Sequence, residues 1–310
     1  MKILKFTACL TAFFMLAMGI NAALVTKDFA VTNTNMEGLG SLRAAVNDAI
    51  KYKATCGDDI LLTENIIFDI PTENKNEVPV IKIPSDLRIN FPNDCGRNSF
   101  NFNINPKDYS GKVKQTVTFD FGNMEFDNFI SLYGDLHIFN VNFINAKISN
   151  SNQSFIHILQ ASSKKESSFL NLTQCTFSNF ERLTSGEPSL QGPYLIDFWS
   201  QGYDRGNAFW CINCKFNNIS DLPIQARYKI VLFIGCYFTG NTITDSDDPQ
   251  IIVEANKELN FGFYGNYIEH NNYPRVNTLY KIIPQGAPEI NQEIRDNTYE
   301  DNIFAPGGTK

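Results

Sequence analysis

The chain has 310 residues, a formal net charge of −7, 13% aromatic residues and 19% charged residues. Disordered chains are poor in aromatic residues and rich in charge, so this composition argues against disorder. The acidic balance argues against nucleic acid as a partner, because nucleic-acid binding needs a basic surface. Two residue types are unusually abundant, with 36 asparagines and 26 phenylalanines, and a fold has to account for both.

The N-terminus has the pattern of a secretory signal peptide. Lys2 and Lys5 precede an uncharged apolar run of 15 residues, and Ala22 and Ala23 follow it. That run is short for a membrane span of roughly 20 residues, although an uncleaved anchor stays an alternative. We therefore expect residues 1–22 to be removed, which takes two lysines away and changes the net charge from −7 to −9. No second apolar stretch of spanning length follows, so the sequence predicts a secreted or cell-surface protein without a transmembrane span.

Export would permit disulfides among the six cysteines that remain. Six cysteines allow fifteen connectivities. Cys56 and Cys95 lie outside the repeats described below, and we expect these two to pair. Cys211 and Cys214 have C-x2-C spacing, but no second pair and no nearby histidine completes a zinc site, so the pattern favours a structural role.

A short signature recurs along the chain, in which an apolar anchor residue is followed two or three positions later by asparagine. The segments are residues 139–145, 172–179, 212–218, 233–241 and 263–271. Their anchors at positions 143, 177, 216, 238 and 268 are separated by 34, 39, 22 and 30 residues. This spacing is too irregular for helical repeats of fixed length and suits a coil of about 22 residues with inserted loops.

Each signature alternates apolar and polar residues, which is the period of a half-buried strand, and a second short strand precedes most of them. Two or three short strands per turn, stacked on the next turn, make a parallel β-helix in which one inward position recurs in every coil. The predicted columns are an aromatic stack of Phe143, Phe177, Phe216 and Phe238, a column of small buried thiols at Cys175, Cys214 and Cys236, and turn amides at Asn145, Asn179, Asn218 and Asn241.

Residues 41–50 have the pattern of a short amphipathic helix, with Ser41 as a candidate N-cap. The Gly-Ser-Leu-Arg motif that begins at Gly40 resembles the N-terminal cap of secreted, right-handed parallel β-helix proteins of the pectin-lyase-like kind. The Cys-x-Phe-x-x-Asn strands resemble repeats of polymorphic outer-membrane proteins and related adhesins. The resemblance implies an all-β fold, a right-handed parallel β-helix with a short N-terminal capping helix.

The predicted organisation has four parts. They are a signal peptide over residues 1–22, a cap and first coil over 23–110, β-helix coils over 111–275, and a C-terminal coil or cap and tail over 276–310. Autotransporter adhesins carry a C-terminal membrane barrel. The 35 residues after position 275 leave no room for such a barrel, so we do not expect self-anchoring in an outer membrane.

This kind of fold hosts lyases, hydrolases and non-catalytic adhesins alike, so the resemblance does not choose among them. Pectin hydrolases carry Asp-Asp and Arg-x-Lys motifs, whose partial counterparts here, at Asp247 and Asp248 and at Arg227 and Lys229, come in reversed order. We therefore expect an adhesin-like, non-catalytic protein that binds an extracellular glycan or a surface protein along its strand faces, without a cofactor.

The alternative is a polysaccharide lyase or glycoside hydrolase that acts on an acidic polysaccharide. Its candidate residues are Asp197, Asp204 and Arg205 for catalysis and Trp199, Tyr203 and Trp210 for stacking on sugar rings. Its candidate calcium ligands are Asp245, Asp247 and Asp248. Buried aromatic rings that close a loop, and a solvated acidic turn, are the structural alternatives for these two groups. Strand alternation predicts that Asp197 points outward.

Overall fold

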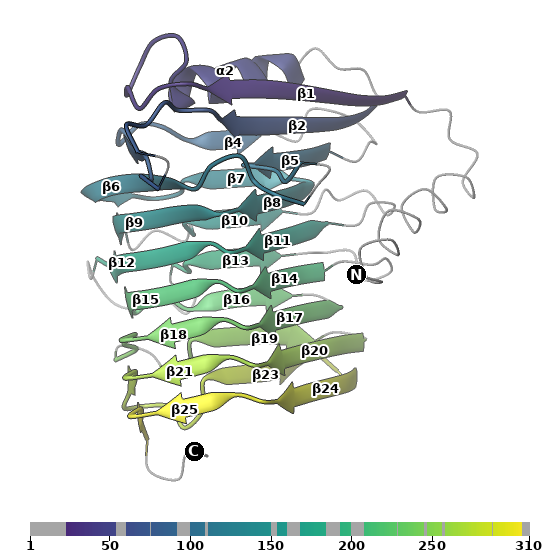
Figure 1. Ribbon diagram of the computed structural model, residues 1–310. Coiled ribbons are helices and arrows are strands. Elements are labelled where there is room, and N and C mark those ends of the chain that lie inside the picture. Colours follow the sequence, from purple (N-terminus) through teal and green to yellow (C-terminus); the bar gives the residue numbers. More distant parts are fainter. Residues whose placement is uncertain are drawn as a thin grey trace.

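The computed structural model describes residues 23–53, 60–74, 76–91, 100–108, 111–149, 154–159, 168–183, 193–199, 208–227, 229–244, 247–255, 258–286 and 288–305. These residues form a right-handed parallel β-helix, as the sequence predicts, with helix α2 (Leu42–Lys53) across its N-terminal end (Figure 1). The predicted signal peptide and both cysteines of the predicted disulfide lie outside the described residues. Within the described ranges, no helix combines the length and the apolar character that a membrane span requires.

Three parallel sheets run along the β-helix, and each coil between the first and the last contributes one strand to each sheet. Sheet A comprises, in spatial order, β1 (Ala23–Val31), β2 (Ile60–Phe68), β5 (Phe100–Ile104), β8 (Asp135–Phe139), β11 (Phe169–Thr173), β14 (Ala208–Ile212), β17 (Ile230–Ile234), β20 (Glu258–Tyr264) and β24 (Glu289–Arg295). Sheet B comprises β3 (Val80–Lys82), β6 (Val117–Phe126), β9 (Val141–Ile148), β12 (Thr176–Arg182), β15 (Lys215–Ser220), β18 (Tyr237–Thr239), β21 (Tyr267–Glu269) and β25 (Thr298–Glu300). Sheet C comprises β4 (Ile89–Phe91), β7 (Ile130–Tyr133), β10 (Ile156–Leu159), β13 (Ile196–Trp199), β16 (Ile224–Arg227), β19 (Ile251–Ala255) and β23 (Tyr280–Pro284). A short pair, β22 (Asn272–Tyr273) and β26 (Ile303–Phe304), extends the last two coils.

The predicted phenylalanine column forms the inner face of sheet B. The rings of Phe143 and Phe177, of Phe177 and Phe216, and of Phe216 and Phe238 are stacked, with centroids 5.0, 5.4 and 5.0 Å apart. The register that pairs β9, β12, β15 and β18 places these rings one above another, and all four are fully buried. Each aromatic pair adds about 0.5–1.5 kcal/mol beyond the area that it buries.

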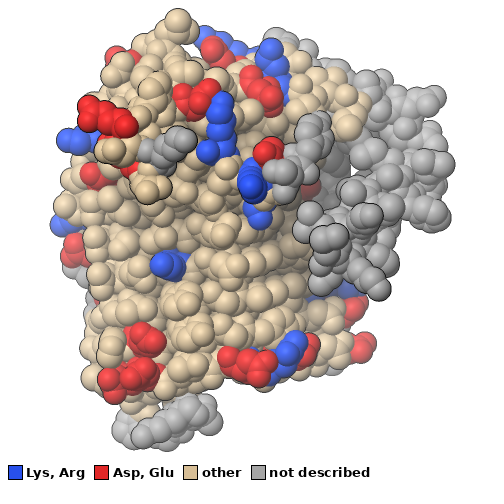
Figure 2. Space-filling model, viewed as in Figure 1, with Lys and Arg blue, Asp and Glu red and all other residues tan. Residues whose placement is uncertain are grey.

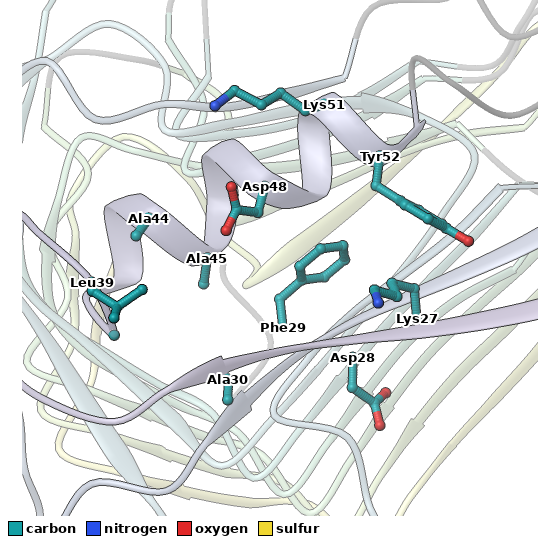
Figure 3. A pocket seen from close by; sticks show the side chains of 11 residues that line it. Lys27, Asp28, Phe29, Ala30, Leu39, Ala44, Ala45, Asp48, Lys51 and Tyr52 are labelled. Carbon is teal, nitrogen blue, oxygen red and sulfur yellow. The ribbon is translucent and has the colours of Figure 1, made fainter.

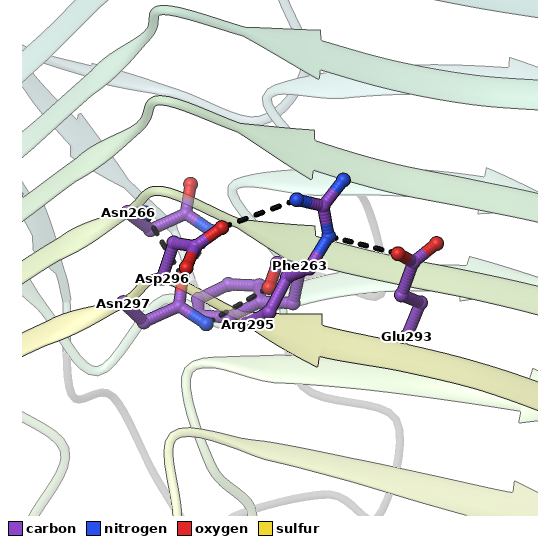
Figure 4. Close-up of polar contacts among 6 residues, drawn as sticks. All are labelled: Phe263, Asn266, Glu293, Arg295, Asp296 and Asn297. Carbon is purple, nitrogen blue, oxygen red and sulfur yellow. Dashed lines mark hydrogen bonds and ion pairs between the residues drawn. The ribbon is translucent and has the colours of Figure 1, made fainter.

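The predicted thiol column lies at the turn before sheet B. Cys175, Cys214 and Cys236 are buried, and each thiol donates to a carbonyl oxygen in the preceding coil at 3.2–3.4 Å. In the last two coils the same position holds Asn266 and Asn297. The N–H of Asn266 donates to Oδ1 of Asn297 at 2.9 Å, and the Asn297 amide donates to the Phe263 carbonyl at 2.8 Å (Figure 4). Small thiols therefore give way to hydrogen-bonding amides toward the C-terminal end.

The predicted turn amides form a ladder over three coils. Asn145, Asn179 and Asn218 all have left-handed backbones, with φ of 61°, 59° and 52°, which asparagine tolerates better than most residues. The Asn179 amide donates to Oδ1 of Asn145 at 3.0 Å, and the Asn218 amide donates to Oδ1 of Asn179 at 3.2 Å. Side-chain amides therefore connect successive coils at this corner.

Asn241 is a turn amide that bonds the neighbouring coils, as predicted, but it does not continue that ladder. Gly240 occupies the aligned position, with φ of 64°, and a Cβ added there would lie 2.6 Å from Oδ1 of Asn218. Asn241 lies one residue later, is fully buried and accepts a hydrogen bond from the N–H of Ile219 at 2.9 Å. The cause is a turn that places asparagine three residues after the anchor Phe238, instead of the two residues seen in the preceding coil.

Helix α2 covers the first coil, as its apolar stripe predicts. Ser41 caps the helix, since its Oγ accepts a hydrogen bond from the N–H of Ala44 at 3.2 Å. The side chains of Leu42, Val46 and Ala49 are buried against the core. A hollow of about 560 Å³ remains between β1 and α2, where Lys27, Phe29, Asp48 and Tyr52 line its walls (Figure 3).

Candidate functional site

Sheet C carries a row of polar side chains on its outer face. The in-register pairing of β7, β10, β13, β16 and β19 aligns these outward positions across five coils. The outward residues, which we call the Asp197 face, include Ser131, His157, Asp197 and Gln225 in one row and Tyr133, Arg227 and Glu254 two residues further along their strands.

Asp197 points outward, as strand alternation predicts, and pairs with a histidine of the neighbouring coil. Oδ2 of Asp197 lies 3.0 Å from Nδ1 of His157, and the two side chains are only 15% and 21% exposed. The pairing of β10 with β13 sets these residues side by side, although 40 positions separate them in the sequence. A carboxylate and an imidazole this close together are groups that can accept and donate a proton.

A second carboxylate lies on the same face. A terminal nitrogen of Arg227 is 2.8 Å from Oε1 of Glu254, and the Gln225 amide donates to the same oxygen at 2.6 Å. Burial raises the pKa of the Tyr194 phenol to about 12, and the nearby carboxylates, that of Asp197 first, add to this rise. Tyr194 therefore stays a neutral hydrogen-bond donor across the physiological pH range.

The structure separates Trp210, one of the aromatic residues that the sequence grouped with Asp197, from that aspartate. Trp199 belongs to β13 and shares the outward register of Asp197, but its side chain lies outside the described part, as do Tyr203, Asp204 and Arg205. Trp210 belongs to β14 in sheet A and packs edge-to-face on Phe169, with ring centroids 4.7 Å apart. Trp210 is therefore on a different sheet from Asp197.

Two of the three candidate calcium ligands lie among the described residues. Asp245 lies outside them, Asp247 is exposed, and a carboxylate oxygen of Asp248 lies 3.5 Å from Nζ of Lys281. No group of three or more His, Cys, Asp or Glu side chains in the described ranges is arranged to hold a metal ion.

A groove of about 600 Å³ follows the corner where sheet A turns into sheet B. We call it the corner groove, and its lining residues are Thr116, Asn140, Gln174, Thr176, Asn213, Lys215, Gly235, Tyr237 and Tyr267. Figure 2 shows that charged side chains are sparse over the middle coils of this face and gather toward its two ends. The groove therefore presents mainly amides, hydroxyls and aromatic rings.

The floor of the corner groove depends on left-handed turns. Asn140, Gln174, Asn213 and Gly235 have φ between 51° and 63° and follow one another in successive coils. A Cβ at Gly235 would lie 2.4 Å from Oδ1 of Asn213, so glycine leaves room for that amide. The turn thus keeps the polar edge of the groove continuous.

Two tyrosines form the C-terminal wall of the corner groove. The rings of Tyr237 and Tyr267 are stacked, with centroids 4.7 Å apart and planes within 8°, and each residue is 39% exposed. Lys215 lies in the coil before Tyr237, and its Nζ is 5.8 Å from the centroid of the Tyr237 ring. Exposed aromatic edges beside neutral polar groups are characteristic of sites that bind small polar ligands.

Sequence reasoning missed His157, Gln225, Glu254 and the corner groove. Each of these side chains is the outward residue of a short alternating strand. An alignment of the strands that precede the signatures, made in a single register, would have brought His157, Asp197 and Gln225 together. Comparison of the chain with protein-family models, curated proteins and solved structures finds no match.

Proposed function

We propose that the protein is an exported, non-catalytic β-helix that binds an extended extracellular glycan in the corner groove. The lining of that groove supports this proposal. It offers amide and hydroxyl groups from four coils, two tyrosines, one lysine and no carboxylate among the described residues. Such groups donate and accept hydrogen bonds with sugar hydroxyls without a large charge to desolvate.

The period of the β-helix favours a linear polymer as the ligand. Neighbouring coils lie about 4.7–4.9 Å apart, which is close to the length of one pyranose unit. A glycan along the helix axis would therefore meet a similar set of amides and hydroxyls at each successive sugar. Several weak subsites in a row add their contributions within one chain of ligand.

The binding test uses residues 23–310 and a panel of neutral and acidic polysaccharides, with binding measured by calorimetry. We expect Tyr237→Ala and Asn213→Ala to weaken binding about tenfold, or ~1.4 kcal/mol. Tyr299→Ala is the matched control, because Tyr299 is 38% exposed but lies at the C-terminal end outside the groove. If glycan binding is the same in every groove variant, the corner groove is not the binding site. If the protein binds a surface protein and no polysaccharide of the panel, the proposed ligand class is wrong.

Export has its own test. The proposal expects that protein recovered outside the cell begins near residue 23, and N-terminal sequencing reads this directly. A chain that keeps Lys2 and Lys5 and stays inside the cell would contradict an extracellular ligand.

A second candidate function is cleavage of an acidic polysaccharide at the Asp197 face. The pair of His157 and Asp197, with Glu254 nearby, favours it, because glycoside hydrolysis uses two carboxyl groups and elimination uses a base. The same panel is assayed for released products, with and without calcium. Product release that Asp197→Asn or Asp204→Ala abolishes and Tyr237→Ala preserves would establish the enzyme and overturn the non-catalytic proposal.

A further inference from the structure

The C-terminal end of the β-helix leaves a strand edge open. In the described part of the chain, β24 pairs with β20 on one side and has no strand on the other. A core-side residue is uncovered here, since Ile294, which follows the buried Phe263 in register, is 41% exposed. Helix α2 lies over the opposite end (Figure 1). Unpaired edges beside exposed apolar side chains are the usual sites of strand addition.

The hydrogen bonds of β24 show which of its peptide groups face the open edge. The N–H of Gly265 donates to the carbonyl oxygen of Arg295 at 3.1 Å, so the peptide groups of Arg295 face β20. These groups alternate along a strand. The N–H and C=O groups of Ile290, Gln292 and Ile294 therefore face outward from the end of the β-helix.

The sequence of β24 is complementary to itself in the antiparallel direction. Its seven residues read Glu-Ile-Asn-Gln-Glu-Ile-Arg. Reversal about the central Gln292 sets Glu289 opposite Arg295 and Ile290 opposite Ile294. These are the pairs that an antiparallel edge needs, opposite charges outside and matched apolar groups inside. We propose that a second copy of this chain pairs with the edge, β24 against β24, about a two-fold axis through Gln292.

The hydrogen-bonding pattern agrees with this axis. The outward-facing peptide groups of Ile290, Gln292 and Ile294 lie symmetrically about Gln292, so each would exchange N–H and C=O bonds with a residue of the partner copy. Gln292 follows Phe261 in the core column, where every other described strand of the middle coils buries an apolar side chain. On the axis, two glutamine amides can satisfy one another.

The surroundings of Arg295 favour the proposed ion pair with Glu289 of the second copy. Nε of Arg295 lies 2.8 Å from Glu293, and a terminal nitrogen lies 3.1 Å from Asp296 (Figure 4). These contacts hold the guanidinium along the strand. A guanidinium has five N–H donors, so it can take a further carboxylate, that of Glu289 from the second copy.

The two ends of the β-helix differ, and the difference limits the assembly. Association of the open end with another open end is isologous and stops at two copies. Growth into a fibre would need the open end to pair with the N-terminal end, where α2 packs over β1 and β2. The inference is therefore a closed dimer with α2 at both tips.

The test is a cysteine placed on the axis, followed by oxidation and non-reducing electrophoresis. In Gln292→Cys the two thiols would face each other across a strand pair with Cα atoms about 5.5 Å apart, so we expect rapid disulfide-linked dimers. In the control Glu289→Cys the two thiols would lie six residues apart in register, roughly 20 Å, and should not link. Equal linking of both variants would overturn the register, and linking of neither would overturn the pairing.

Charge reversal checks the same pairing without cross-linking. Sedimentation velocity of the wild-type chain should show a concentration-dependent dimer. Glu289→Arg alone and Arg295→Glu alone should each weaken it about tenfold, and the double variant should recover it. A wild-type chain that stays monomeric, species larger than a dimer, or a double variant as weak as the single ones would each contradict the proposal.

Discussion

Oδ1 of Asn271 accepts a hydrogen bond from the main-chain N–H of Asn241 at 2.8 Å, and Oδ1 of Asn302 does the same for Asn271 at 3.0 Å. The amides of these residues also donate to main-chain carbonyl oxygens, that of Asn271 to Phe238 at 2.8 Å. Asn241 and Asn271 are buried. Each side chain therefore replaces the backbone bonds that a strand loses where the coil turns.

We expect Asn271→Ala to lower the free energy of unfolding by about 2–3 kcal/mol, because it removes the side-chain partner of two buried main-chain groups in the preceding coil, the N–H of Asn241 and the carbonyl of Phe238. The control is Asn217→Ala, an asparagine on the outer face of β15, which should change stability by less than about 0.5 kcal/mol. Urea unfolding followed by circular dichroism gives both values. If both variants lose the same free energy of unfolding, the hydrogen bonds of the buried asparagine contribute no more to stability than an exposed asparagine does.

Two glycines with nearly the same backbone conformation separate the cost of a steric clash from the cost of a left-handed backbone. Gly240 and Gly265 have φ of 64° and 59°, but a Cβ at Gly240 meets Oδ1 of Asn218 at 2.6 Å, whereas a Cβ at Gly265 meets nothing within 4 Å. Gly265→Ala should therefore cost about 1 kcal/mol for the left-handed backbone alone. Gly240→Ala should cost at least ~1 kcal/mol more, because the Asn218 amide must move. Thermal unfolding that ranks Gly265→Ala as the more harmful change would contradict this view of the corner.

The fold follows from patterns that are local in the sequence. The alternation around Phe143, Phe177 and Phe216 fixes which side chains stack, and the spacing of Leu42, Val46 and Ala49 fixes the face of α2. Asn241 lies outside the ladder of Asn218 because it comes one residue later in its turn, and a shift of one residue turns a side chain to the other face. An irregular coil length hides such a shift until the strands are paired.

The candidate site follows less directly, because its residues meet through the register between coils. His157 and Asp197 are neighbours only because loops of unequal length bring β10 beside β13. Trp210 is 13 residues from Asp197 in the sequence, yet it lies on another sheet. Distance along the chain is therefore a poor guide to proximity in a β-helix, and the strand-by-strand register is the quantity to determine.

Glu64 makes the first coil sensitive to pH. Its side chain is fully buried beneath α2, and neither carboxyl oxygen has a hydrogen-bond partner among the described residues. Burial raises the pKa of this carboxyl from 4.5 to about 8, and the charge of Lys53 opposes part of the rise. The folded state thus favours the protonated acid, so stability is highest at low pH and falls as the pH rises from the unfolded to the folded pKa.

We expect the wild-type chain to lose on the order of 4 kcal/mol of stability between pH 5 and pH 9 through this one group. Glu64→Gln keeps the shape and removes the titration, so its unfolding curve should flatten over that range. The measurement is chemical unfolding at several pH values, with exposed Glu77→Gln as the control. Identical pH profiles for wild type and Glu64→Gln would contradict the assignment of the slope to Glu64.

Four buried thiols of the described residues, three at the turns before sheet B and that of Cys211 in β14, should be chemically unreactive in the folded protein. Burial raises the pKa of the Cys175 and Cys211 thiols, and no part of Cys211, Cys214 or Cys236 reaches solvent. Alkylation requires an exposed thiolate. Iodoacetamide should therefore label these four residues only after denaturant unfolds the coils, with peptide mass spectrometry as the readout. Labelling at a rate that does not depend on denaturant would show that the coils open locally, and Cys214→Ala would then cost less than the roughly 1–2 kcal/mol expected for loss of a buried, well-packed side chain.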